Sequence, residues 1–145
     1  MSRMTIAELL AVARCELQRL DVATAWEAMR EGAVLIDIRP EDEISAGGRV
    51  PGALVIGRNV LEWRLDPDSG ARHPEGPGLD DQVILMCEEG YQSSLAAVIL
   101  KRLGFRCATD LIGGFGAWRD AGLPVEPSVR PHPVGSAGAG LPAPV

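Results

Sequence analysis

The architecture of this 145-residue chain can be read outward from one segment, Gln82-Val83-Ile84-Leu85-Met86-Cys87-Glu88-Glu89-Gly90-Tyr91-Gln92-Ser93. After Gln82 it runs through four apolar residues, two of them β-branched, which is typical of a strand buried in a parallel sheet. A loop with one glycine follows Cys87, and we expect Ser93 or Ser94 to cap a helix that continues to Leu103. A strand that leads through a short loop into a helix is the building unit of an α/β fold.

The same alternation of strands and helices continues on both sides of this segment. Short apolar runs predict strands over 33–38, 53–56 and 107–111. Helices are predicted over 6–17, 22–31, 41–46 and 114–121, and Asn59 is the expected cap of a brief helix between them. Thr5 (with Glu8 three residues later) and Asp21 are the expected caps of the first two helices, while 17–20 fits either a helix end or a short strand. The sequence therefore predicts an open, mostly parallel sheet of about five short strands with helices on both faces.

Composition divides the chain into three parts. Residues 1–20 are predicted to form an N-terminal helical extension, and 21–126 the α/β domain. Residues 127–145 contain five prolines and three glycines, so we expect a disordered tail there. The extension carries charged residues within its apolar pattern, Arg14 and Glu16 among them, and this argues against a secretory or membrane-spanning segment.

Charge and cysteine content narrow the function further. The net charge of −6 argues against nucleic acid and anionic membranes as partners. Cys15, Cys87 and Cys107 are too few and too scattered for a disulfide framework, so we expect reduced thiols and a cytoplasmic protein, with Cys15 and Cys107 structural. The two histidines lie in stretches rich in proline and glycine, so no metal site and no cofactor are expected.

Cys87 is the candidate nucleophile because of where it stands. Ligands of open α/β sheets bind beyond the carboxyl ends of the strands, and Cys87 occupies such an end. A glycine in the following loop allows several N–H groups to point inward, and the next helix begins nearby, so a thiolate would be stabilised. The competing interpretation is that Cys87 is a small buried residue that ends a strand.

Three signatures make the chain resemble a rhodanese-like domain over roughly 21–125. They are Leu35-Ile36-Asp37-Ile38-Arg39 followed by Gly48-Arg49-Val50-Pro51-Gly52-Ala53, then Cys87-Glu88-Glu89-Gly90-Tyr91-Gln92-Ser93, and Leu111-Ile112-Gly113-Gly114-Phe115-Gly116-Ala117-Trp118 continued by Gly122-Leu123-Pro124-Val125. The resemblance implies a sulfurtransferase in which Cys87 takes a sulfane sulfur from a donor (a small molecule or a protein persulfide) and passes it to a thiol acceptor. It also implies that the backbone amides of the loop, Glu88, Glu89, Gly90, Tyr91, Gln92 and Ser93, hold the persulfide.

The loop departs from the family pattern in its charge, because it carries two glutamates and no basic residue. In water, one carboxylate about 6 Å from the sulfur costs a thiolate about 0.7 kcal/mol. This argues against the thiosulfate anion as the donor and favours a protein persulfide or another thiol. Asp37 and Arg39, at a strand end, are interpreted first as a structural ion pair and second as support for the loop.

Two other functions remain open at this point. The domain could be a binding or regulatory module whose cysteine does little, which the acidic loop favours. It could also be a cysteine phosphatase or arsenate reductase, but such enzymes need an arginine six positions after the nucleophile to grip the oxyanion, and Ser93 stands there.

Overall fold

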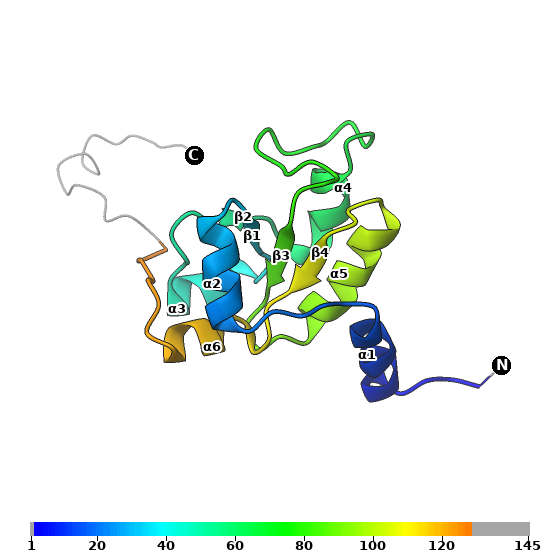
Figure 1. Ribbon diagram of the computed structural model, residues 1–145, viewed down its shortest axis with the longest axis horizontal. Helices are drawn as coiled ribbons and strands as arrows, with labels where there is room; N and C mark the ends of the chain where they lie inside the picture. Colours follow the sequence, from blue (N-terminus) through cyan, green and yellow to red (C-terminus); the bar gives the residue numbers. More distant parts are fainter. Residues whose placement is uncertain (1, 129–145) are drawn as a thin grey trace.

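The computed structural model describes residues 2–128 as an α/β domain built on a parallel four-stranded sheet (Figure 1). The strands lie in the order β2 (Leu54–Val55), β1 (Val34–Asp37), β3 (Val83–Met86) and β4 (Ala108–Asp110). The predicted fold class is therefore confirmed, with four strands where about five were expected. Next to the end of β4, Leu20 forms an isolated parallel bridge with Leu111, so only one residue of the segment 17–20 joins the edge of the sheet.

The register of the sheet brings the ends of its central strands together. Val34 pairs with Val83 and Asp37 with Met86, so β1 and β3 run side by side over their whole length. Because parallel strands end at the same edge, Cys87 follows β3 beside the end of β1. This edge carries the candidate site.

Helices cover both faces of the sheet because successive strand residues point to opposite sides. On one face, Leu35, Ile84 and Met86 pack with Phe115 and Trp118. This face is covered by α2 (Val22–Arg30) and α6 (Gly114–Asp120), as Figure 1 shows.

The opposite face is equally apolar. Val83 and Leu85 pack there with Leu61, Leu65 and Leu100. These leucines belong to α4 (Leu61–Leu65) and α5 (Gln92–Arg102), which cover this side of the sheet. The remaining short helices are α3 (Glu41–Gly47), which follows β1, and the 3₁₀ turn η1 (Arg58–Val60). Burial of both faces explains why the strands are continuous apolar runs.

The N-terminal extension folds as a separate helix against the domain. Its helix α1 (Ile6–Cys15) begins with the predicted capping box, since the Glu8 N–H donates to Thr5 Oγ1 and the Thr5 N–H donates to the Glu8 carboxylate. The predicted cap of α2 is also confirmed, because Asp21 accepts from the Thr24 N–H at 2.8 Å. α1 packs against α5, and the chain then passes along β4.

Two predicted caps are wrong. Helix α5 begins at Gln92 after Tyr91, and Ser93 and Ser94 lie inside it with hydroxyls that donate to Asp110 at 2.7 and 2.8 Å. The carboxylate of Asp110 is fully buried and requires these donors. The two hydroxyls therefore bond to Asp110 in a neighbouring strand and do not cap the helix. Asn59 caps no helix either, because Gly57 and Val60 precede η1 and α4 without a side-chain cap.

The C-terminal part closes the domain next to α3. The indole N–H of Trp118 donates to the Pro124 carbonyl at 2.8 Å, and Arg49 forms an antiparallel bridge with Glu126. The expected disordered tail, 127–145, falls outside the described residues from 129 onward. Within residues 2–128, no helix has the length and apolar character needed to cross a membrane.

Candidate active site

Cys87 lies at the carboxyl end of β3, where the chain turns back toward α5. Gly90 has a φ of +87°, and its N–H donates to Cys87 Sγ at 3.1 Å. A Cβ at position 90 would lie 2.8 Å from the Gly113 nitrogen, so only glycine fits. The loop therefore turns tightly enough to aim a backbone donor at the sulfur.

The thiol of Cys87 is enclosed by the residues around it. Cys87 is only 2% exposed, and within residues 2–128 the Gly90 N–H is the single backbone donor bonded to Sγ, where several were expected. Cys87 nevertheless lines a surface cavity of about 430 Å³. The other residues of this cavity are Glu43, Glu88, Glu89, Tyr91 and Gln92. The cavity gives a small molecule a route to the loop that encloses the sulfur.

The first residues of the loop are fixed by α6. The Phe115 N–H donates to the Cys87 carbonyl at 2.8 Å, and the Gly116 N–H donates to the Glu88 carbonyl at 3.1 Å. Gly114 has a φ of +60°, and a Cβ there would collide with the carbonyl oxygen of Cys87. From the sequence, Gly114 was quoted only as part of the third signature. The structure shows that it also lets α6 approach the loop.

The Asp37–Arg39 pair lies directly behind the loop. Both side chains are fully buried, and Arg39 holds Asp37 through Nε at 3.0 Å and Nη2 at 2.8 Å. The remaining nitrogen, Nη1, donates to the Glu88 carboxylate at 3.2 Å, and the guanidinium stacks 3.9 Å from the Phe115 ring centroid. Arg39 thus forms the ion pair with Asp37 and contacts the loop through Glu88 at the same time. The expected ion pair and a contact that could support the loop are therefore both present.

The two loop glutamates differ in their surroundings. Glu88 is paired with Arg39, which offsets the effect of its negative charge on the sulfur. Glu89 is exposed, so solvent screens its charge. The electrostatic cost expected from two free carboxylates is reduced accordingly.

Glu43, on α3, is a third carboxyl group of the cavity and was not singled out from the sequence. Its Oε1 is buried and has no hydrogen-bond partner within residues 2–128. Burial raises the pKa of Glu43 above its ordinary value of 4.5, and the negative charges of Glu88 and Asp42 raise it further. The group consequently takes up a proton more readily than an ordinary glutamate.

The outer side of the loop is held by two arginines that the sequence analysis also missed. Arg14 Nη2 and Arg19 Nη2 both donate to the Gly90 carbonyl, at 2.7 and 3.0 Å. Arg19 also forms a two-pronged pair with the buried Asp110. No local pattern marks these contacts, because more than seventy residues of sequence separate each arginine from Gly90.

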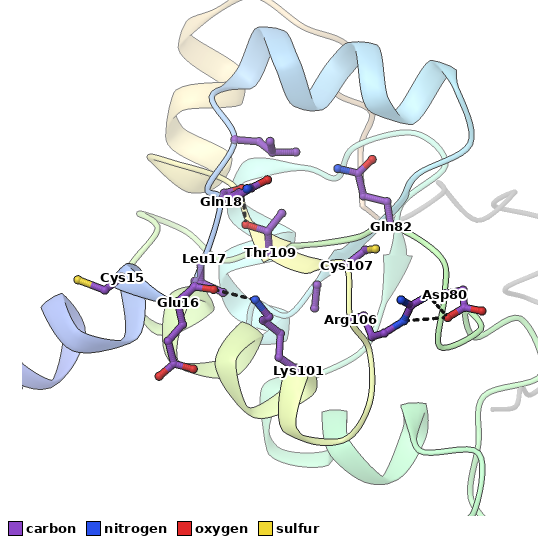
Figure 2. Close-up of a pocket in the computed structure, with 12 residues that line it drawn as sticks. Cys15, Glu16, Leu17, Gln18, Asp80, Gln82, Lys101, Arg106, Cys107 and Thr109 are labelled. Atoms are coloured by element: carbon purple, nitrogen blue, oxygen red, sulfur yellow. Dashed lines mark hydrogen bonds and ion pairs between the residues drawn. The ribbon is translucent and has the colours of Figure 1, made fainter.

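The other two cysteines lie away from this site. Both are exposed, and their assignment as structural residues stays a prediction. They line a separate cavity of about 620 Å³ with Lys101 and Arg106 (Figure 2), where they are well separated from one another. Val83 pairs with Ala108, so Cys107 lies at the amino ends of the strands, and about five residues of strand, roughly 16 Å, separate its position from that of Cys87.

Comparisons with known proteins agree with the fold. A family model described as the rhodanese-like domain matches residues 21–121. The thiosulfate sulfurtransferase GlpE of Haemophilus influenzae is 31% identical over 102 residues, which cover 70% of this chain and 88% of that protein.

Two solved structures are similar to the chain. A protein of unknown function from Rhodopseudomonas palustris, RPA3614, described as a possible tyrosine phosphatase, is 33% identical with a TM-score of 0.78. The match covers 87% of this chain and 97% of that one. The human single-domain sulfurtransferase TSTD1 is 27% identical with a TM-score of 0.62, over 70% of this chain and 95% of that one. With the family model covering most of the sequence, this chain belongs to the rhodanese-like domain family.

Proposed function

We propose that this protein is a sulfurtransferase that carries a sulfane sulfur as a persulfide on Cys87. The observation that carries the proposal is the hydrogen bond from the Gly90 N–H to Cys87 Sγ. Cys87 lies at the carboxyl end of β3, where it lines a surface cavity. A donor aimed at the sulfur stabilises negative charge on it, and the reaction requires that charge. Relatives named as sulfurtransferases support this class of reaction.

The reaction consists of two displacements at sulfur. The Cys87 thiolate attacks the outer sulfur of a donor, the donor's sulfur–sulfur bond breaks, and the remainder of the donor leaves with the electron pair. A thiolate acceptor then attacks the outer sulfur of the Cys87 persulfide and releases Cys87 as a thiolate. One sulfur–sulfur bond is exchanged for another in each step, so no external oxidant or reductant is needed.

The loop supplies the binding site for the persulfide in this proposal. The outer sulfur carries the negative charge, and the Gly90 N–H is the nearest donor. The N–H groups of Tyr91 and Gln92 have no acceptor within residues 2–128, because the first N–H groups of a helix lack partners. Together with the other amides of 88–93, they are the remaining donors for the anion.

The charge around the cavity favours a donor other than thiosulfate. Three of its lining residues are glutamates, namely Glu43, Glu88 and Glu89, and only Glu88 has a cationic partner within residues 2–128. A doubly negative donor meets repulsion from the unpaired carboxylates. We infer that a persulfide of a thiol, on a small molecule or on a protein, is the donor, and that a second thiol is the acceptor.

Mass spectrometry of the intact protein after incubation with sulfane donors tests the proposal. With a glutathione persulfide, Cys87 should gain the mass of one sulfur atom, and a thiol acceptor should remove it. Cys107→Ser is the matched control, because it keeps the adduct, while Cys87→Ser abolishes it. Thiosulfate should load the protein more slowly than the persulfide at equal concentration.

The burial of Cys87 favours a second candidate, a module whose thiol does not react. Alkylation separates the two functions. A sulfurtransferase requires Cys87 to alkylate faster at neutral pH than the exposed Cys15 and Cys107, despite its burial. Alkylation no faster than in the urea-unfolded protein, with no sulfur adduct from any donor, would support the module.

Phosphatase activity has less support from the site. No arginine occurs between Cys87 and Ser93. Of the arginines that contact the loop, Arg39 donates to the Glu88 carboxylate and Arg14 to the Gly90 carbonyl. Turnover of an aryl phosphate that disappears in Cys87→Ser would overturn the proposed sulfur transfer.

A further inference from the structure

The peptide bond between Gly90 and Tyr91 is gripped from outside the loop by two guanidinium groups. Arg14 and Arg19 donate to its carbonyl oxygen at 2.7 and 3.0 Å. In a trans peptide the N–H points opposite to the C=O, so the Tyr91 N–H is turned away from both arginines. On the other side of Gly90, its own N–H donates to Cys87 Sγ. The two arginines therefore fix the orientation of the donors at the turn that encloses the sulfur.

The network continues into the first turn of α5. Arg14 Nε donates to Ser94 Oγ at 3.1 Å, and the Ser94 hydroxyl donates to Asp110 at 2.8 Å. Asp110 is fully buried and also binds Arg19, with Nε to Oδ1 at 2.8 Å. The loop and the start of α5 are thus tied to one buried carboxylate.

The two arginines differ in charge balance. Arg19 is neutralised by Asp110, but Arg14 has no carboxylate partner within residues 2–128. Its guanidinium also lies 5.7 Å from the ring of Tyr91, which lines the Cys87 cavity. Arg14 is consequently a net positive charge beside a loop whose only charged side chains, Glu88 and Glu89, are acidic.

We propose that Arg14 and Arg19 are positioning residues for sulfur transfer, and that Arg14 supplies the cationic charge that the Cys87 loop lacks. Both precede the part of the chain that the family model matches, 21–121, so the N-terminal extension completes the site from outside the common domain. The sulfur-transfer part of this inference rests on the proposed function. The electrostatic part concerns the reactivity of Cys87 and can be tested without it.

Two alkylating reagents, one neutral and one anionic, distinguish the effect of the Arg14 charge from a structural effect of Arg14. In a Cys15→Ser, Cys107→Ser background, Cys87 is alkylated by neutral iodoacetamide and by anionic iodoacetate. One unit charge about 7 Å from the reacting atom changes the rate with an anion by about threefold in water. Arg14→Ala should lower the ratio of the iodoacetate rate to the iodoacetamide rate by this factor, and Arg14→Lys should restore it.

Lys101→Ala is the matched control. Lys101 Nζ donates to the Glu16 carbonyl at 2.8 Å, so it ties the end of α1 to α5 with one positive charge but does not contact the loop. The control should keep the wild-type ratio. For sulfur transfer from a persulfide donor, Arg14→Ala should lower the second-order rate constant by about tenfold to a hundredfold, as expected for loss of one charge-assisted hydrogen bond.

The outcomes decide between the parts of the inference. If Arg14→Ala and Lys101→Ala behave alike in both reagents, the inference is overturned. An equal fall with both reagents that Arg14→Lys does not rescue would reduce Arg14 to a structural residue and also contradict it. Arg14→Gln, which keeps a polar amide on a shorter side chain without the charge, gives the same test if Arg14→Ala does not fold. Failure of every donor to load wild-type Cys87 contradicts the proposed function, while the reagent ratio still tests the charge.

Discussion

Arg39 holds Asp37 with two of its nitrogens and Glu88 with the third, at 3.2 Å, so one guanidinium joins the end of β1 to the Cys87 loop. The side chains of Arg39 and Asp37 are both fully buried, so solvent does not screen the charges of this pair. A buried pair of this kind contributes modestly to stability while it is intact, but the loss of one partner leaves an uncompensated charge.

Replacement of Arg39 should therefore be severe. Arg39→Met keeps much of the side-chain volume but strands the Asp37 carboxylate, and we expect it to lower the free energy of unfolding by about 3–5 kcal/mol. Urea denaturation followed by circular dichroism measures this loss. Arg106→Met removes an arginine from an exposed pair with Asp80 and should cost less than about 1 kcal/mol. Equal losses in the free energy of unfolding would show that the buried pair contributes no more to stability than the exposed pair.

The serines of α5 provide a milder test of the same buried edge. The Ser93 hydroxyl is fully buried and donates to Asp110 at 2.7 Å. Ser93→Ala removes one of several donors to that carboxylate, and we expect it to lower the free energy of unfolding by about 1–3 kcal/mol. Ser45→Ala, at an exposed position of α3, has the same gain in helix propensity without the buried hydrogen bond. Thermal unfolding should show a loss in Ser93→Ala and no loss in Ser45→Ala.

The serines also show where the sequence was sufficient and where it was not. Thr5 and Asp21 were predicted correctly as caps because the groups that they satisfy lie within three residues. The strands were found for a similar reason, since burial on both faces leaves an apolar run of four residues such as Val83–Met86. Ser93 was assigned wrongly because its partner, Asp110, lies seventeen residues away in another strand.

The candidate site divides in the same way. Cys87 and its loop could be located from the sequence because a strand end, a glycine and a helix start are local signals. The contacts of Arg14 and Arg19 with Gly90 depend on the packing of α1 on α5 and on the path of the segment that follows α1, and no pattern in the residues encodes that path. The degree of enclosure of Cys87 was likewise inaccessible, because neighbouring side chains from α3 and the loop set it.

Glu43 should make stability depend on pH. Its pKa is raised in the folded protein, mainly by burial, so the charged form is disfavoured relative to the unfolded chain. The resulting penalty is present above the folded pKa and disappears as the pH falls toward the ordinary value of 4.5. Glu43→Gln should therefore raise Tm at pH 7, and the gain should vanish near pH 4. Because the carboxyl group is partly solvated, the gain is small.

The control for Glu43 is an exposed glutamate with no buried oxygen. Glu31→Gln, just after α2, changes the same charge without relief from burial. Its Tm should follow that of the wild type across the pH range. If Glu31→Gln shows the same gain at pH 7 as Glu43→Gln, the effect comes from net charge and not from the cavity.

Gly114 should be intolerant of any side chain because α6 approaches the loop there. Gly114→Ala combines a left-handed backbone, with a φ of +60°, and a collision with the Cys87 carbonyl oxygen. Gly52→Ala is the matched control, since Gly52 has a φ of +83° but open space around the added carbon. The control should cost about 1–2 kcal/mol from backbone strain alone. Gly114→Ala should cost at least about 2 kcal/mol more, because rigid backbone must move.

The movement has a consequence for the site that stability alone does not report. A shift of α6 weakens the bonds from Phe115 and Gly116 to the loop carbonyls and so frees the turn that directs the Gly90 N–H at the sulfur. Under conditions where both variants remain folded, Gly114→Ala should lose most of its sulfur-transfer rate, while Gly52→Ala should retain it. A folded Gly114→Ala variant with the wild-type rate would show that these contacts do not position the thiol.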